Sequence, residues 1–242
     1  MLMVNQLAGF GAFQGSAPYT TSSVRVSGDR LTPAVSGAPT SAEFIISFWL
    51  RDKAAGADRY FIQETGNVSI LSAQPAAFRL GWQAITGLSG VAGNHASPGT
   101  TNDTWCHYIM SCSVANSRGQ MYVDGVANGT FTPSGAGHNW STVHTWFSHP
   151  TNVAQVDAEI AEWYIHCSAS LDLSVPSNLE KFRSSAGKPV DLGADGSTPT
   201  GSQPHYYHKG GTQAEFIDNK GSLGDAVVSS GALAAGASSP SD

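Results

Sequence analysis

The sequence predicts an all-β protein built as a two-sheet antiparallel sandwich. Short runs with a hydrophobic residue at every second position recur along the chain, and clusters of Gly, Pro, Ser, Asn and Asp separate them. The 242 residues are 40% hydrophobic, which is enough to bury one sizeable core. We therefore expect one sandwich domain over residues 24–183, with an extended N-terminal arm over residues 1–23 and a Gly/Ser/Pro-rich C-terminal extension over residues 184–242.

The elements follow from these patterns in chain order. The N-terminal arm is rich in Gly, Ala, Ser and Thr, which suits either a partly ordered terminus or a segment that lies on a neighbouring subunit. The strongest strand is Glu43–Arg51, where Phe44 and Phe48 lie on the core face. Other strands are expected at Val24–Val26, Tyr60–Gln63, Val68–Leu71, Ala77–Trp82, Trp105–Val114, Gln120–Val123, Val126–Phe131, Val143–Phe147 and Ala158–Cys167.

The strands between Trp105 and Phe131 are expected to form an antiparallel meander. Asp124 and Gly125 separate two of them, and this dipeptide favours a two-residue hairpin because both turn positions need a positive φ. After the last long strand, one short helix is expected over Leu171–Phe182, because Ser177 and Glu180 have capping-box spacing. From residue 184 onward the composition predicts an extended tail without a core of its own.

Two motifs carry a resemblance to a known family. Trp105, an alternating strand, a polar loop and then the run Gly119–Gly125 resemble the laminin-G-like, concanavalin A-like jelly-roll family. Glu159–Ile165 is similar to the last long strand of that family. Two C-terminal runs, Gly187–Gly196 and Phe216–Gly221, resemble stretches of concanavalin A-like proteins encoded by tailed bacteriophages and prophages. The resemblance implies a jelly-roll fold, and in many members a calcium site in the loops.

Charge and hydropathy exclude two classes of partner. The net charge is −6 and Lys and Arg never cluster, so no nucleic-acid partner is expected. No apolar run is long enough to span a bilayer, so membrane insertion is not expected. The first residues lack the pattern of a signal peptide, which predicts that the chain is initially kept in a cytoplasm.

The three cysteines do not form a disulfide framework. Cys106 and Cys112 lie on one expected strand roughly 20 Å apart, which is beyond the reach of a bridge. Cys167 could pair with either of them, but a small buried thiol fits its apolar strand better.

Candidate binding residues are aromatic and acidic. Stacking against a sugar ring would use Trp49, Trp82, Trp140 or Trp146, although a Trp in such a strand also packs commonly in a core. No cofactor is predicted, and the candidates for calcium are three loop carboxylates, each of which is also typical of a solvated turn. They are Asp103, Asp124 and Asp157.

A glycosidase mechanism is not supported. Retaining hydrolysis needs two carboxyl groups about 5–5.5 Å apart. Glu159 and Glu162 are three residues apart, so on a regular strand they point to opposite faces. We expect one of them to accept hydrogen bonds from backbone groups near a sheet corner, and we expect no enzymatic activity.

These observations lead to two functional hypotheses. The first is a non-enzymatic structural protein of a tailed-phage virion, assembled in the host bacterial cytoplasm as a capsid decoration protein or a tail appendage. Low charge, the phage-like segments and the terminal arms favour it, with copies of itself and other virion proteins as partners. The alternative is a carbohydrate-binding module for attachment to a host surface, with glycans as partners.

Overall fold

The structure is a computed structural model, and most of the predicted N-terminal arm lies outside the residues that it describes. The described residues are 19–52, 59–64, 68–74, 79–82, 88, 93–94, 103–142, 144–148 and 156–242.

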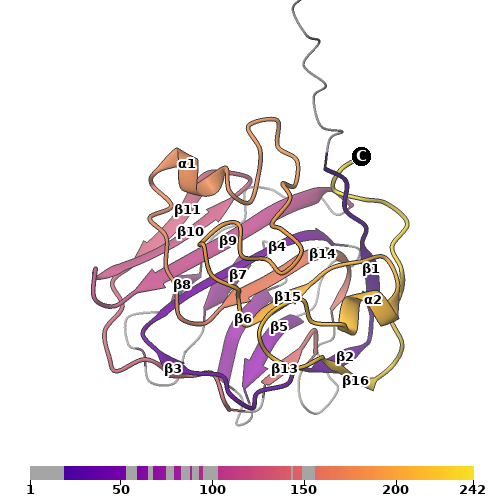
Figure 1. Ribbon diagram of the computed structural model, residues 1–242, viewed down its shortest axis with the longest axis horizontal. Helices are drawn as coiled ribbons and strands as arrows, with labels where there is room; N and C mark the ends of the chain where they lie inside the picture. The colour runs from indigo at the N-terminus through magenta and orange to yellow at the C-terminus, as the bar shows by residue number, and fades with distance from the viewer. Residues whose placement is uncertain are drawn as a thin grey trace, which may run out of the picture.

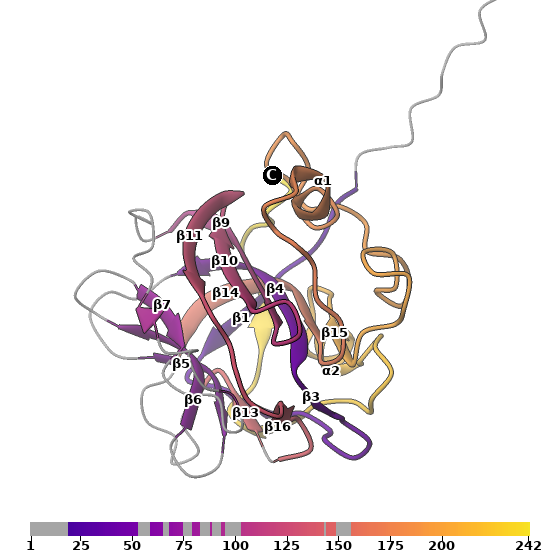
Figure 2. The same ribbon diagram turned by 90° about the vertical axis from the view of Figure 1, so that its left-hand side faces the viewer.

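Two antiparallel sheets pack face to face, as Figures 1 and 2 show. We call the larger one sheet A. Its described strands run in the order β11-β10-β9-β4-β14-β1-β17, and β15 pairs with β14 beside the end of β1. These strands are β1 (Val24–Ser27), β4 (Glu43–Asp52), β9 (Trp105–Ser113), β10 (Arg118–Val123), β11 (Val126–Phe131), β14 (Asp157–His166), β15 (Tyr206–His208) and β17 (Ala234–Ala235).

The second sheet, sheet B, has the strand order β16-β2-β13-β5-β6-β7-β8. A separate short pair, β3 with β12, joins two loops. The strands outside sheet A are β2 (Arg30–Thr32), β3 (Thr40–Ser41), β5 (Arg59–Glu64), β6 (Val68–Gln74), β7 (Arg79–Trp82), β8 (Gly93–Asn94), β12 (His138–Asn139), β13 (His144–Trp146) and β16 (Val227–Ser230). The predicted all-β, two-sheet antiparallel jelly-roll sandwich is therefore confirmed.

The main core lies between the sheets and follows from the alternation in the strands. On β4, Phe44 and Phe48 point inward, and the Phe48 ring stacks on Tyr108 of β9 at a centroid distance of 5.4 Å. Cys106 and Cys112 lie in this core as free thiols, and Cys167 is also buried and free, which confirms the prediction of buried thiols.

The predicted meander is β9, β10 and β11. Asp124 and Gly125 have φ values of 50° and 79°, as a two-residue hairpin turn requires. The Asp124 carboxylate also accepts a hydrogen bond of 2.9 Å from the backbone N–H of His107. Asp124 therefore stabilises the turn in two ways: it adopts the positive φ that the turn needs, and its side chain accepts a hydrogen bond from the neighbouring strand.

The prediction that residues 184–242 form a tail without a core is wrong. The outer face of sheet A carries Ile45, Ile109 and Tyr164, and the chain after β14 covers it, as the orange and yellow segments in Figure 2 show. Leu192 and Tyr207 of the C-terminal segment complete this second cluster. The same segment adds β15 and β17 to sheet A and β16 to sheet B. An irregular, Gly-rich segment can cover the face of the sheet in this way, because it buries only a few widely spaced apolar side chains. Such a segment does not require the alternating hydrophobic residues of a strand.

The helices also differ from the prediction. The described residues contain α1 (Pro176–Leu179), which is shorter than predicted, and α2 (Gln213–Ile217), which was not predicted. Proline begins α1 because its ring fixes a helical φ, and no side chain caps this helix. The capping box lies in α2, between Thr212 and Glu215. Within the described part of the chain, no helix is long and apolar enough to cross a membrane.

The packing of the C-terminal layer predicts a stability effect. Leu192 is 2% exposed, so Leu192→Ala should lower the free energy of unfolding by about 2–5 kcal/mol in urea titrations, because it leaves a cavity under the layer. As a control, Val227→Ala at a 63% exposed position should cost less than about 1 kcal/mol. Equal, small effects of both changes would mean that the layer does not pack on the sheet.

Candidate functional site

Three of the four tryptophans proposed as a stacking platform are buried. Trp49 is 3% exposed on the outer face of sheet A, where its ring packs against His107 at 4.9 Å. Trp140 and Trp146 are each 1% exposed in the main core. None of these three rings presents a face to a ligand, because each is at most 3% exposed. Trp82 lies in β7, and its side chain is outside the described residues.

The three candidate calcium ligands do not come together. Asp103 forms a salt bridge of 3.0 Å with Arg51, and Asp157 forms one with Arg25. Asp124 lies 3.9 Å from the guanidinium of Arg183 and belongs to its turn. In the described ranges, no three His, Cys, Asp or Glu side chains are grouped to hold a metal ion.

A β-bulge in β14 corrects the expectation about Glu159 and Glu162. The register with β4 shifts between Ala161 and Tyr164, and Glu162 has a φ of 52°. Ile160 and Trp163, although three residues apart, both belong to the main core. The bulge therefore places both glutamates on the outer side of sheet A, where a regular strand would separate them.

Glu162 lies at a junction in the sheet. On one edge of β14, β1 pairs as far as Ile160 and β15 begins to pair at Trp163. Segment 19–23 crosses this gap before it enters β1. Glu162 is 2% exposed, and its carboxylate accepts a hydrogen bond of 2.8 Å from the Tyr19 hydroxyl and others from the hydroxyls of Thr21 and Tyr207. One buried carboxylate thus joins the N-terminal segment to the C-terminal layer.

Glu159 has a comparable set of partners. Its carboxylate lies 3.1 Å from Arg51, and it accepts hydrogen bonds of 3.0 Å from the Ser238 hydroxyl and from the backbone N–H of Ala237. The last contact confirms that one of the two glutamates accepts a backbone hydrogen bond near the sheet edge.

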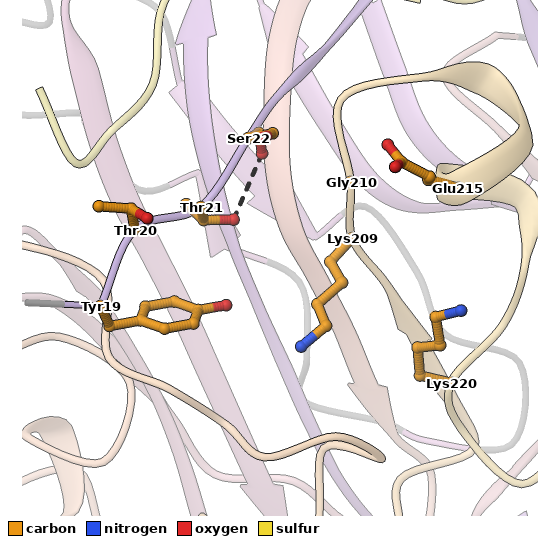
Figure 3. Close-up of a pocket in the computed structure, with 8 residues that line it drawn as sticks. All are labelled: Tyr19, Thr20, Thr21, Ser22, Lys209, Gly210, Glu215 and Lys220. Atoms are coloured by element: carbon orange, nitrogen blue, oxygen red, sulfur yellow. Dashed lines mark hydrogen bonds between the residues drawn. The ribbon is translucent and has the colours of Figure 1, made fainter. Parts of the chain in front are cut away.

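A pocket opens where the two terminal segments meet, and we call it the terminal pocket (Figure 3). Its volume is about 380 Å³. One wall is segment 19–22, with the Tyr19 ring and the hydroxyls of Thr20, Thr21 and Ser22. The facing wall comes from the turn before α2, from α2 itself and from the loop after it. Its residues are Lys209, Gly210, Glu215 and Lys220.

Hydrogen bonds and charge fix the second wall. Glu215 accepts from the backbone N–H groups of Gly211 and Thr212, at 2.9 and 3.1 Å. The Lys209 ammonium lies 5.0 Å from the centroid of the Tyr207 ring, which is a cation–π contact. The pocket therefore offers an aromatic ring, hydroxyl groups and an ammonium group from rigidly held positions.

Sequence reasoning did not locate this pocket. Segment 19–22 belongs to the predicted arm, and residues 209–220 belong to the predicted tail. One signal was present, because Thr212 and Glu215 have capping-box spacing and mark α2. No local pattern shows that segments about 190 residues apart in the chain face each other.

Comparison by sequence identifies no family. No protein-family model matches the chain. No curated protein matches it either.

Solved structures show the fold. The chain is similar to a Bacteroides ovatus protein with a provisional carbohydrate-binding assignment, at a TM-score of 0.58 and 10% identity over 93% of this chain. The match covers 62% of that protein, so the chain spans less than two thirds of its length. A heptameric pentraxin of Limulus polyphemus matches at a TM-score of 0.49 and 11% identity, over 88% of this chain and 96% of the pentraxin. Domains LG4-5 of mouse laminin α1 match at a TM-score of 0.45 and 13% identity. This match covers 69% of this chain and 48% of the laminin chain.

The first of these likenesses supports the class of fold. The chain is an antiparallel jelly-roll sandwich, as the two sequence motifs predicted. An identity of 10% shows the fold alone.

The hydroxyl network around Glu162 predicts a dependence on alkaline pH. Burial and the nearby Glu162 carboxylate raise the pKa values of Tyr19 and Tyr207. A tyrosine with a raised folded pKa stabilises the fold fully below its unfolded pKa of about 10, and this stabilisation is lost as pH rises further. The free energy of unfolding should therefore fall as pH rises from about 9.5 through about 11 in urea titrations, and Tyr207→Phe should reduce the slope over this window. Parallel declines in the two proteins would contradict the role of Tyr207.

Proposed function

We propose that the protein is a non-catalytic carbohydrate-binding module, and that the terminal pocket holds the sugar. The observation that carries the proposal is the pairing of the Tyr19 ring with the hydroxyl groups of Thr20 and Ser22 around one open pocket. A pyranose has an apolar face of C–H groups and a rim of hydroxyls, so an aromatic ring beside donors and acceptors matches both surfaces.

Size and fold support the same proposal. A volume of about 380 Å³ falls in the range of small-molecule sites and suits a sugar unit or two. The carbohydrate-binding assignment of the Bacteroides ovatus protein adds support from a protein with the same fold. The pocket in this chain is built by its own terminal segments, so the likeness of fold does not by itself place a sugar there.

The state of the two glutamates supports a non-catalytic role. Glu162 is 2% exposed and both of its oxygens accept hydrogen bonds from hydroxyl groups. Glu159 is 1% exposed and pairs with Arg51. A hydrolase needs one carboxyl group to reach the leaving oxygen and another to reach the sugar or a water molecule. These two carboxylates instead hold the terminal segments on sheet A.

Replacement of the Tyr19 ring tests the binding proposal. Glycans that bind the wild-type protein on an array should bind Tyr19→Ala roughly tenfold more weakly or worse, because the stacking surface is lost. Tyr19→Phe keeps the ring and should retain most of the affinity. Trp49→Phe, at a buried position away from the pocket, serves as a control for general effects of aromatic replacement. Unchanged binding by Tyr19→Ala would reject the terminal pocket as the site.

We also propose that this module serves in the particle of a tailed phage, as a capsid decoration protein or tail appendage that contacts glycans on a host surface. The argument from the terminal arms is weaker than the sequence suggested, because the C-terminal extension packs on sheet A of its own chain. The observations that favour it are the charged fraction of 12%, about half the usual value, and the two phage-like segments. A surface lectin and a particle component are compatible roles.

Mass spectrometry of purified particles checks the second proposal. The protein should be present in many copies per particle, and antibody labelling should place it on the head or the tail. A protein found in infected or lysogenic cells but absent from purified particles would contradict the structural role, whatever its affinity for glycans.

A further inference from the structure

Lys209 brings a positive charge to the terminal pocket, and none of the described carboxylates forms a salt bridge with it. Its Nζ lies 3.3 Å from the carbonyl oxygen of Gly193 and 5.0 Å from the centroid of the Tyr207 ring. A carbonyl oxygen and an aromatic face orient an ammonium group but leave its full charge available to a ligand.

The other charged groups of the pocket are already engaged. Lys220 forms a salt bridge with Asp218. One carboxylate oxygen of Glu215 accepts the two backbone N–H groups at the start of α2. Figure 3 shows the Lys209 side chain extending toward the Tyr19 side of the pocket, away from Glu215. The unpaired positive charge offered to a ligand is therefore the Lys209 ammonium, which lines the same pocket as the proposed stacking ring.

The position of this ammonium depends on the same buried carboxylate that holds the rest of the site. The Tyr207 hydroxyl donates to Glu162, and the Tyr207 ring in turn lies under Lys209. Glu162 also holds the Tyr19 hydroxyl at 2.8 Å. The ring and the ammonium are therefore fixed relative to each other by one group, which suits recognition of a ligand with an apolar face and an anionic substituent.

We infer that the terminal pocket is selective for a sugar that carries a carboxylate, with the carboxylate on the Lys209 ammonium and the sugar ring against Tyr19. This inference rests on the proposed carbohydrate-binding function and names the class of its ligand. The protein as a whole carries a net charge of −6, which repels long polyanions. We therefore expect a single acidic unit, or a short chain that ends in one, to bind better than a highly charged polymer.

Matched pairs of ligands that differ only in charge provide the test. Glucuronic, galacturonic and N-acetylneuraminic acid, each as a short glycoside, are compared with their methyl esters by titration calorimetry. At least one acid should bind the wild-type protein roughly tenfold more tightly than its ester. Lys209→Gln should abolish this difference, whereas Lys209→Arg should keep part of it. Lys220→Gln is the control, because it removes a lysine of the same pocket that is already paired.

Each outcome distinguishes the inference from the function on which it rests. Equal affinity for acid and ester, or a preference that survives in Lys209→Gln, would overturn the inference. If neutral glycans bind as tightly as the acids and this binding requires Tyr19, the module function stands and only the acidic selectivity fails. If neither acids nor neutral glycans bind, both proposals fail. If Lys209→Gln does not fold, the comparison of acids with esters in the wild-type protein still tests the selectivity for a carboxylate.

Discussion

The buried carboxylate of Glu162 is the interaction on which the arrangement of both chain ends depends. It lies where the neighbour of β14 changes from β1 to β15, so no strand covers it from that side. A buried anion is costly unless hydrogen bonds compensate for lost hydration, and here Tyr19, Thr21 and Tyr207 supply them. Their hydroxyls come from both ends of the chain. The hydrogen bonds that compensate for the burial of the Glu162 carboxylate therefore also fix the position of the two terminal segments.

The C-terminal layer also limits where the terminal pocket can lie. In many β-sandwiches one sheet face is free to bind ligands, but here the outer face of sheet A carries Ile45, Ile109 and Tyr164, and the C-terminal layer covers it. Trp49, which lies on that face, is also buried and packs against the His107 ring. Exposed polar and aromatic groups are found instead where the layer meets segment 19–22.

The sequence predicted the sandwich well because its strands have local signals. The alternation over Glu43–Arg51 and the Asp124-Gly125 turn depend only on neighbouring residues, and both predictions are confirmed. The site was not predictable in this way. Glu162 was expected on the opposite face from Glu159, because the sequence of the strand does not reveal the bulge. Its partners Tyr19 and Tyr207 are also far away in the sequence. Composition suggested a tail, since the apolar residues of the covering layer are too widely spaced to form a pattern.

The two walls of the terminal pocket have a consequence for the order of folding. Segment 19–22 leaves the ribosome early, whereas Lys209 and Lys220 follow about 190 residues later. Thr21 also bonds to Ser239 and Ser241, close to the last residue of the chain. A nascent chain can form β4 and β9 before these groups are made, but it cannot form the pocket. The terminal pocket can therefore form only after residue 220 has been synthesised, late relative to the strands of the main core.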